Sequence, residues 1–570
     1  AADVLPIAIG IIGLIVIVAI SYRQTIHAYP GGGGAYIVAK ENLGQMAGLI
    51  AGAALLIDYV LTAAVSVASG IAAFTSAVPA FTDQRILLCL LIVLFIALAN
   101  LRGARESGAL FAFPTYGFVV IMLVMLALGF YRFFTGQIEP VIYPPWHLEQ
   151  AHGTEDMVKN IGLFLILRAF ASGCAALTGI EAVSNGVTAF RKPEADNAST
   201  VLGWMAGILG TLFFGITFLS MRYHLLPYGA EQEDYQTIVS QLAMQVFHGR
   251  NVAYFLVQGF TTGILLLAAN TAFADFPRLA SLMARDGYLP RQFGTLGDKL
   301  VFANGIVILG LFACVLLVAF GGDTHQLIPL YAVGVFLSFT LSQSGMVIHW
   351  LKEKAAHGGK SHHKYSLFIN GFGAILTFLV LIVIGYTKFV HGAWIVVVLI
   401  PILVAGFLAI KRHYADVARQ LSLEGQMPPE SDPHKIHHVV LVPISGIQLA
   451  VVRALQYAKS MAADAVRVVY VNLNQATTDK LVERWGEWGM GIPLVILESP
   501  YRSILDPLVR YVERVQDEPD TDFITVLLPE FLTARWWHAF LHNQTAFMLR
   551  TFLTFKEGVV VTSVRWHLKR

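Results

Sequence analysis

Residues 48 to 70 read GLIAGAALLIDYVLTAAVSVASG, an apolar run in which Asp58 is the only charged side chain. In a helix, about 20 such residues cross the roughly 30 Å hydrocarbon core of a membrane. Thr62 and Ser66 follow Asp58 at successive intervals of four residues, so a helix places the three oxygen-bearing side chains on one face. A carboxylate at membrane depth costs several kcal/mol unless it faces a wet cavity or a partner. The run therefore predicts a membrane helix with a functional site at Asp58.

The composition of the whole chain indicates the same class of protein. Of 570 residues, 56% are hydrophobic and only 13% are charged, with a mean hydropathy of +0.64. A soluble protein of this length carries about twice that charged fraction. A net charge of +2 is too small to indicate binding to a nucleic acid polymer. We therefore expect an α-helical polytopic protein of the lipid bilayer.

Apolar stretches of spanning length recur along residues 1–411, which we assign to a transmembrane transporter domain. Counting the stretches that are long enough to cross the hydrocarbon core predicts about eleven spans. They lie near residues 5–21, 47–70, 86–101, 110–134, 161–189, 200–222, 252–275, 301–320, 326–350, 367–387 and 391–410.

The distribution of basic residues predicts how these spans are oriented. The loops on one side carry sixteen Lys and Arg side chains, whereas the loops on the other side carry six and include an acidic cluster. Because short cytoplasmic loops are enriched in Lys and Arg, the tail after residue 411 is expected to be cytoplasmic. An odd number of spans then places Ala1 outside. Since the chain begins with Ala-Ala-Asp and enters a span at once, we expect that an N-terminal helix is missing from it.

The composition changes after the last span, where a linker over residues 412–435 leads to a second domain over residues 436–570. Alternating strands and helices indicate a cytoplasmic α/β domain with a parallel sheet, suited to regulation or dimerisation. Its loop Pro443-Ile444-Ser445-Gly446 has one glycine where phosphate-binding loops need several, so nucleotide binding remains a weaker alternative. The predicted strands lie near 438–443, 466–472, 494–497, 523–528 and 559–564, and the predicted helices near 449–462, 505–515 and 536–552.

The fifth predicted span contains a polar interruption. Two glycines, two hydroxyls and one acid lie in an otherwise apolar stretch, at Ser172, Gly173, Thr178, Gly179 and Glu181. This combination favours an unwound break, where free backbone carbonyls coordinate a cation. The alternative is that the glycines only allow close helix packing, which leaves the acid unexplained.

The ninth predicted span also carries hydroxyl groups. Tyr331 and Ser338 are seven residues apart and share one helix face, with Thr340 and Ser342 beyond them. Ser and Thr in membrane helices often bond only to their own helix or to a neighbouring one, and we expect this for most of these side chains. Tyr331, deeper in the span, is a candidate ligand.

Several motifs carry a resemblance to a known family. Residues 29–38 read YPGGGGAYIV, residues 178–185 read TGIEAVSN, and residues 328–336 read IPLYAVGVF. These stretches resemble the amino acid, polyamine and organocation (APC) transporter superfamily. The tail motif LHNQTAF at residues 541–547, which amino acid permeases generally lack, narrows the resemblance to the KimA-like branch of KUP-type potassium importers. The similarity runs along nearly the whole chain.

The resemblance implies a LeuT-like fold, with a five-plus-five inverted repeat and two further helices, followed by a domain similar to universal stress proteins. It implies a non-enzymatic symporter of the cytoplasmic membrane that imports potassium with protons and needs no cofactor. It also implies a homodimer formed through the tail and regulation by cyclic di-AMP. The family's first helix, with its acid and tyrosine, has no counterpart in this chain. The family's ion contacts correspond here to Asp58, Tyr59, Thr62, Ser66, Thr178 and Tyr331, and an acidic position linked to coupling corresponds to Glu181.

The chemistry of the residues agrees with this implication. Potassium is a hard cation, and hydroxyls, carbonyls and one or two carboxylates make a weak, releasable site for it. In this interpretation Asp58 offsets the charge of the ion and Tyr331 closes the site. A buried carboxyl exchanges protons during a transport cycle, and Glu181 is the first candidate for this role, with Asp58 the second. The groups that replace the hydration shell of potassium are those of Thr62, Ser66 and Thr178.

Two other functions are compatible with the sequence. An amino acid or amine permease of the same fold would hold a carboxylate and an amine at the broken helix, although the negative charge of Asp58 disfavours an anionic group. A membrane sensor would bind its ligand without transporting it and would signal through the tail. Potassium uptake by the wild type and by Asp58→Asn distinguishes the symporter from both alternatives.

Overall fold

The structure of the protein is a computed structural model. It divides into two compact units, Ala1–Ser422 and Leu423–Arg570, which are described separately. Most of the predicted linker and residues 541–544 of the tail motif lie outside the described residues. The described residues are 4–32, 34–103, 108–141, 163–226, 236–295, 301–357, 361–389, 392–422, 437–461, 463–499, 503–519, 521–532 and 545–567.

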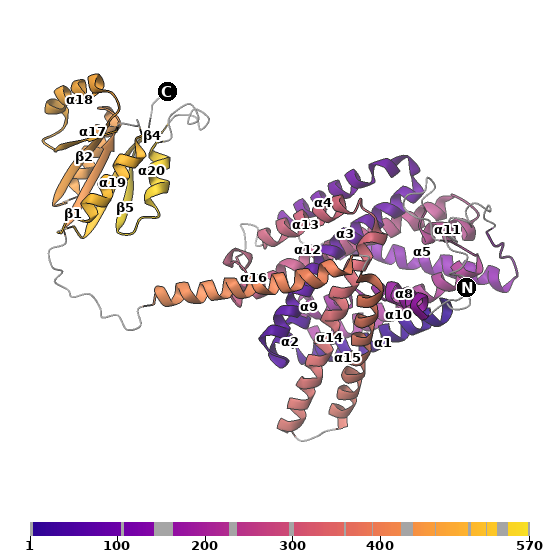
Figure 1. Ribbon diagram of the computed structural model, residues 1–570. Coiled ribbons are helices and arrows are strands. Elements are labelled where there is room, and N and C mark those ends of the chain that lie inside the picture. The colour runs from indigo at the N-terminus through magenta and orange to yellow at the C-terminus, as the bar shows by residue number, and fades with distance from the viewer. Residues whose placement is uncertain are drawn as a thin grey trace. The chain divides into compact units, whose positions relative to one another are not determined.

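The first unit is a bundle of helices (Figure 1). Within the described ranges, ten helical segments are long and apolar enough to cross a membrane, and α13 is a shorter apolar helix of 17 residues. Each of the eleven predicted spans overlaps one of these segments, so the expected α-helical membrane architecture is confirmed. The helices are α1 (Val4–Ala28), α2 (Gly34–Asn42), α3 (Gln45–Ala77), α4 (Arg85–Leu101), α5 (Gly108–Phe134), α8 (Leu163–Gly173), α9 (Ile180–Asn185), α10 (Glu194–Arg222), α11 (Ile238–Phe247), α12 (Val252–Arg285), α13 (Ala303–Ala319), α14 (Thr324–His357), α15 (Ser361–Lys388) and α16 (Ala393–Gln420).

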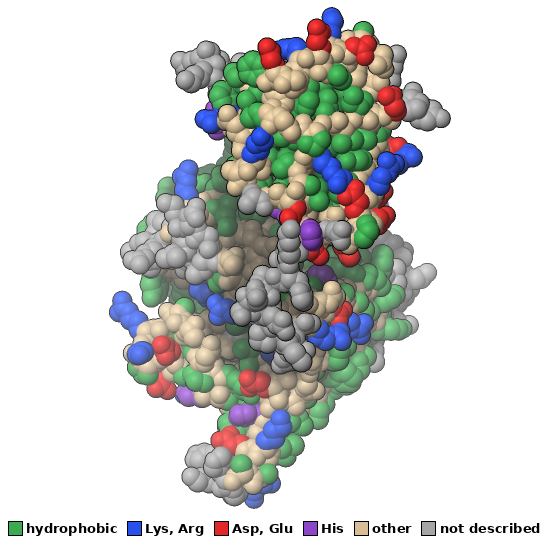
Figure 2. Space-filling view, turned by 90° about the vertical axis from the view of Figure 1, so that its left-hand side faces the viewer, with side chains coloured by type: hydrophobic (Ala, Val, Ile, Leu, Met, Phe, Trp, Pro, Cys, Tyr) green, Lys and Arg blue, Asp and Glu red, His purple; other side chains and the backbone are tan. Residues whose placement is uncertain are grey.

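Two spans form the centre of this bundle. The most apolar windows of α3 and α14 are each 78% buried, whereas those of the other candidate spans are 17–39% buried. The outer helices expose many large hydrophobic side chains, and Figure 2 shows such side chains on the visible surface. This is the distribution expected of a protein whose outer surface faces lipid. The polar residues of α3 and α14 are therefore shielded from the lipid by the helices around them.

The fifth predicted span is broken, as its polar interruption predicts. Helix α8 ends at Gly173, and a 3₁₀ turn covers Cys174–Leu177. Thr178 is extended and Gly179 has a left-handed φ of 87°, after which α9 begins. Glycine adopts this conformation without the steric cost that a side chain would add. The sequence between the two glycines thus separates one span into two helical pieces.

Two glycines of the motif YPGGGGAYIV, Gly32 and Gly34, lie against the end of the second piece. A Cβ atom on Gly34 would lie 1.7 Å from Oδ1 of Asn185, and one on Gly32 would lie 2.8 Å from the Asn185 carbonyl oxygen. Both glycines also have positive φ angles, of 45° and 77°. A side chain at either of these two positions would collide with Asn185, so Gly32 and Gly34 allow the chain to pack closely against the end of α9.

The second unit is an α/β domain. Its five strands form one parallel sheet in the order β3-β2-β1-β4-β5, with Val439 paired to Ala465 and to Ile524. Both faces of the sheet are covered by apolar side chains, as expected for a parallel sheet. The elements are β1 (His438–Ile444), α17 (Leu449–Ser460), β2 (Ala465–Asn472), α18 (Gln475–Trp488), β3 (Leu494–Glu498), α19 (Leu505–Gln516), β4 (Phe523–Leu532), α20 (Thr545–Leu553) and β5 (Val559–His567).

All five predicted strands are present in this domain, and so are the predicted helices α17 and α19. Of the predicted helix 536–552, the described part forms α20, which begins at Thr545. Helix α18 lies between β2 and β3 and was not predicted.

Candidate ion-binding site

Two carboxylates meet in the centre of the membrane unit. Asp58 lies on α3 and Glu181 on α9, and their carboxyl groups interact directly. The side chains are almost fully buried, with exposed fractions of 3% for Asp58 and 2% for Glu181. Within the described part of the chain, neither carboxyl interacts with a Lys or Arg side chain. Two adjacent buried negative charges repel each other, so the pair requires a proton or a bound cation.

Part of the hydrogen-bonding capacity of this pair is unused. The hydroxyl of Ser338 on α14 donates to Oε2 of Glu181 at 3.1 Å. Among the described residues, Oδ1 of Asp58 and Oε1 of Glu181 have no hydrogen-bond partner. A buried oxygen without a partner carries a cost of about 1–3 kcal/mol. Such atoms are suited to receive a cation or a proton.

Three side chains with hydroxyl groups lie close to Asp58. The Tyr331 side chain on α14 lies beside those of Thr62 and Thr178, and close to Asp58. The hydroxyl of Thr178 donates to the Ala175 carbonyl at 2.9 Å within the broken span. Because its proton is already used, the oxygen of this hydroxyl presents lone pairs to a ligand. Thr62, Thr178 and Tyr331 therefore meet around one point although they belong to three separate segments.

A glycine lets these segments approach each other. A Cβ atom on Gly334 of α14 would lie 3.2 Å from the carbonyl oxygen of Ala54 and 4.0 Å from Cβ of Asp58. Such a contact is tight for a side chain, so α14 can pack this closely on α3 only where it carries glycine. Gly334 thereby brings Tyr331, one turn away, to the level of Asp58.

The remaining two predicted ligands are not among the hydroxyl side chains that lie beside Tyr331. Ser66 is buried on the same face of α3 as Asp58, two turns or about 12 Å along the axis. The hydroxyl of Tyr59 accepts a hydrogen bond from Nδ2 of Asn185 at the end of α9. Tyr59 thus joins α3 to the broken span.

One group of buried hydroxyls does not follow from the sequence pattern. The pattern places Ser338 on a helix face and predicts local bonding for Ser342, and it gives no role to Tyr22 on α1. In the structure the side chain of Tyr22 lies beside both serines and near Glu181. By contrast, Thr340 does donate to the carbonyl of Phe336 in its own helix, at 2.7 Å, as expected. A tyrosine within the apolar run of α1 was the signal that could have identified this group.

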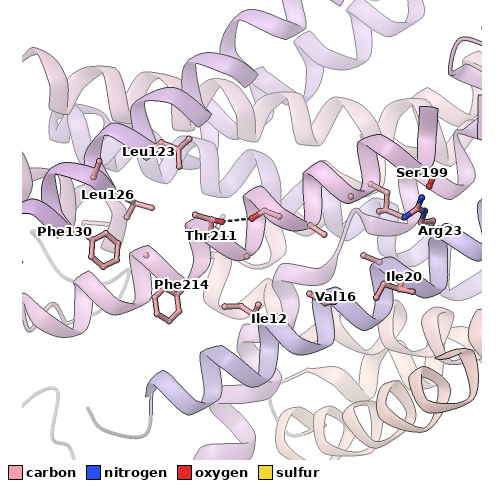
Figure 3. Close-up of a pocket in the computed structure, with 18 residues that line it drawn as sticks. Ile12, Val16, Ile20, Arg23, Leu123, Leu126, Phe130, Ser199, Thr211 and Phe214 are labelled. Carbon is pink, nitrogen blue, oxygen red and sulfur yellow. Dashed lines mark hydrogen bonds between the residues drawn. The ribbon is translucent and has the colours of Figure 1, made fainter. Parts of the chain in front are cut away.

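A separate cavity of about 780 Å³ lies between α1, α5 and α10 (Figure 3). Its walls are mainly apolar, and it contains none of the predicted ion ligands. The hydroxyl of Thr211 in its wall donates to the Gly207 carbonyl at 2.8 Å. An apolar wall does not replace the hydration shell of a bare cation. The oxygen cluster, and not this cavity, is therefore the candidate ion-binding site.

A bundle of apolar helices, a broken span and a buried oxygen cluster define a polytopic membrane transporter of the amino acid permease class. Residues 2–408 match the family model described as amino acid permease, and residues 435–566 match that of the KimA potassium transporter C-terminal domain. The chain is 45% identical to the potassium transporter KimA of Bacillus subtilis (strain 168), over 99% of this chain and 90% of that one. It belongs to the KimA family of amino acid permease-type transporters, which are not enzymes.

Other proteins match part of the chain. The low-affinity putrescine importer PlaP of Escherichia coli (strain K12) is 25% identical over 63% of this chain and 76% of its own length. A solved manganese transporter of Eremococcus coleocola is 16% identical, with a TM-score of 0.33, and the match covers 72% of this chain and 88% of that one.

Proposed function

We propose that this protein is a secondary active transporter that imports potassium ions together with protons. The observation that carries the proposal is the buried pair of carboxylates, Asp58 and Glu181, beside a group of hydroxyls at a broken span. One carboxylate offsets the charge of a bound potassium ion and the other exchanges a proton. The high identity to a potassium transporter over almost the whole chain supports the choice of ion.

The potassium site is assigned to oxygen atoms of α3, the broken span and α14. Asp58 supplies charge, and Thr62, Thr178 and Tyr331 supply neutral oxygens in place of water. Ser66, two turns away on the same face, is assigned to the path by which the ion reaches or leaves the site. Tyr59 positions the broken span through its hydrogen bond with Asn185.

Proton coupling is assigned to Glu181, with Asp58 as the second candidate. Glu181 accepts a hydrogen bond from Ser338, whereas Asp58 lies nearer the hydroxyls assigned to potassium. Protonation of Glu181 removes one of two adjacent negative charges and so changes the affinity of the site for a cation. Movement of one helix bundle about this site then gives alternating access.

The other two functions have less support. A putrescine importer is among the relatives, but at 25% identity and over 63% of the chain. The KimA-type tail is present as well, which an amino acid permease or an amine importer would not require. A sensor that does not transport would have no need of two carboxylates that bind a cation and a proton in turn.

The tail is assigned to the cytoplasm, and the membrane to the cytoplasmic membrane, on the basis of the excess of basic residues in one set of loops. We assign homodimerisation to the α20 region, where Phe547, Phe552 and Phe555 have exposed fractions of 63%, 59% and 85%. Exposed aromatic side chains in such a group favour an interface. A second copy of the domain is the proposed partner.

Regulation by cyclic di-AMP is assigned to the carboxyl ends of the strands, where ligands of parallel sheets bind. Polar side chains gather at this edge. Asn472 donates to the Glu498 carboxylate at 3.1 and 3.2 Å. Ser563 bonds to Glu530 at 3.1 Å, and Arg550 pairs with the same carboxylate. Calorimetric titration of residues 435–570 with cyclic di-AMP tests this assignment.

The potassium proposal is tested by uptake in a bacterial strain that lacks its other potassium importers. Asp58→Asn keeps the size of the side chain but removes its charge, and is expected to raise the KM for potassium at least about tenfold, equivalent to roughly 1.4 kcal/mol. Asp196→Asn is the control, because this carboxylate is exposed on α10 and pairs with His27. Undiminished uptake by Asp58→Asn would exclude the proposed ion site.

A further inference from the structure

A chain of three hydroxyl groups begins at Glu181 and leads away from the proposed potassium site. Ser338 and Ser342 are one turn apart on α14, and Tyr22 of α1 lies beside both. The first link is formed, since Ser338 donates to Oε2 of Glu181 at 3.1 Å. The ring of Tyr22 packs edge-on against Phe339, with 5.5 Å between centroids. This contact holds the phenol between the two serines.

The three groups are buried, and packing alone does not account for them. Their exposed fractions are 0% for Tyr22 and Ser338 and 1% for Ser342. Neither the hydroxyl of Tyr22 nor that of Ser342 has a hydrogen-bond partner within the ranges that the structure describes. Buried polar groups are nearly always hydrogen-bonded, so unpaired ones call for an explanation. Three unpaired or singly paired hydroxyls in contact are suited to pass a proton.

We propose that Ser338, Tyr22 and Ser342 form the path by which the proton of Glu181 leaves the site. This inference rests on the proposed function and adds a route to it. No part of the route coincides with Thr62, Thr178 or Tyr331, so the ion and the proton move through different groups. The protein thereby avoids two cations competing for one passage.

The proton balance of the route is simple. When Glu181 is protonated, the Ser338 hydroxyl turns so that its oxygen accepts from the carboxylic acid and its proton points to Tyr22. The acid then gives its proton to the oxygen of Ser338 while Ser338 passes its own hydroxyl proton to Tyr22. Tyr22 passes its phenolic proton to Ser342, and Ser342 passes one to a water molecule. Each hydroxyl gains one proton and loses one. The net result is a carboxylate at Glu181 and a hydronium ion in the water.

The route is closed in the conformation described here. Met346 follows Ser342 by one turn on the same face of α14 and is fully buried. The next polar side chain on that face is His349, which lies 3.4 Å from the Tyr29 hydroxyl and 3.6 Å from the Glu353 carboxylate. Water must enter past Met346 before Ser342 can release a proton. Release is therefore linked to an opening of this end of α14, the end assigned to the cytoplasm.

The test uses the full chain in proteoliposomes that contain a pH-sensitive dye. Two rates are measured, potassium-driven proton movement and potassium tracer exchange at equal concentrations, which needs no net proton transfer. Tyr22→Phe removes one hydroxyl, and we expect proton movement to fall about tenfold or more, with a smaller decrease in exchange. Ser342→Ala is expected to act in the same way, and Ser342→Thr, which restores a hydroxyl, is expected to recover proton movement.

Thr340→Ala is the matched control for this test. Thr340 lies between the two serines in sequence but bonds to Phe336 and Thr377, so its removal should change neither rate by more than about twofold. Equal proton movement in the wild type, Tyr22→Phe and Ser342→Ala would overturn the route while leaving the potassium site intact. A parallel fall of both rates in Tyr22→Phe would assign Tyr22 a structural role and would also overturn it. Absence of potassium exchange in the wild type would instead overturn the proposed function, and the route with it.

Discussion

The carboxyl groups of Asp58 and Glu181 touch each other although one lies on a continuous helix and the other on a short piece of a broken span. Continuous α3 fixes the position of Asp58. The position of Glu181 depends on how α9 is held. The distance between the two carboxyl groups is therefore set by a helical piece of only six residues. This suits the proposed site, whose affinity for a cation has to change during transport.

Glu181→Gln is expected to separate potassium binding from proton coupling. Glutamine keeps the size of the side chain and its ability to accept from Ser338, but it cannot release a proton. Potassium uptake by the wild type should rise as the external medium becomes more acidic, whereas uptake by Glu181→Gln should not respond. The measurement is uptake over a series of external pH values at a fixed membrane potential. An unchanged pH response in this variant would move the coupling role to Asp58.

Gly34→Ala is expected to destabilise the membrane unit and to lower transport. The new Cβ would lie 1.7 Å from Oδ1 of Asn185, so the end of α9 and its bond to Tyr59 would be displaced. A clash of this kind costs about 1–3 kcal/mol or more. Gly31→Ala is the control, because nothing lies within 4 Å of its Cβ position. Thermal unfolding in detergent compares the two variants, and equal midpoints would contradict the proposed anchoring of α9.

The pH dependence of the C-terminal unit should reflect one ion pair. Arg467 donates to both carboxylate oxygens of Glu518, at 2.7 and 2.8 Å, and this hydrogen bonding lowers the pKa of Glu518. A lowered pKa in the folded state adds stability above the unfolded pKa, about 4.3, and this stability is lost as the pH falls through the folded value. Because both side chains are partly exposed, we expect about 1 kcal/mol or less.

The measurement for this ion pair is urea unfolding of residues 435–570 at neutral and acidic pH. Arg467→Met should lose stability at neutral pH and little at acidic pH. Arg510→Met is the control, because its pair with Asp506 is exposed and should contribute little. Equal losses for the two variants at neutral pH would show that Glu518 is not stabilised by Arg467.

The membrane helices could be predicted from the sequence because each span must bury its backbone polar groups in its own hydrogen bonds and cover them with apolar side chains. The break at Gly179 could be predicted because glycine, hydroxyl and acid residues together are rare in such a run. The strands of the tail could be predicted from runs of β-branched residues. These are local signals, and each depends on one short segment.

The missed features depend on contacts between segments or on weak local signals. Helix α18 is largely polar, and only Thr478 and Leu481 on it are buried, so it has little apolar periodicity. Tyr22 is one aromatic residue in an apolar helix, and its position between Ser338 and Ser342 follows from the packing of α1 near α14. A single sequence does not give the relative rotation of two distant helices. The hydroxyl chain therefore emerged only from the three-dimensional arrangement.

The left-handed turn at Gly179 has a mechanical consequence. It interrupts the ladder of backbone hydrogen bonds, so α9, a helical piece of six residues, can tilt independently of α8. Glu181 is the second residue of α9 and lies close to the turn. A small tilt therefore changes the direction of its carboxyl group more than its depth in the membrane. In the proposed transport cycle, a slight tilt of this short helix therefore alters the separation of the two acids, and with it the electrostatic repulsion that a bound cation offsets.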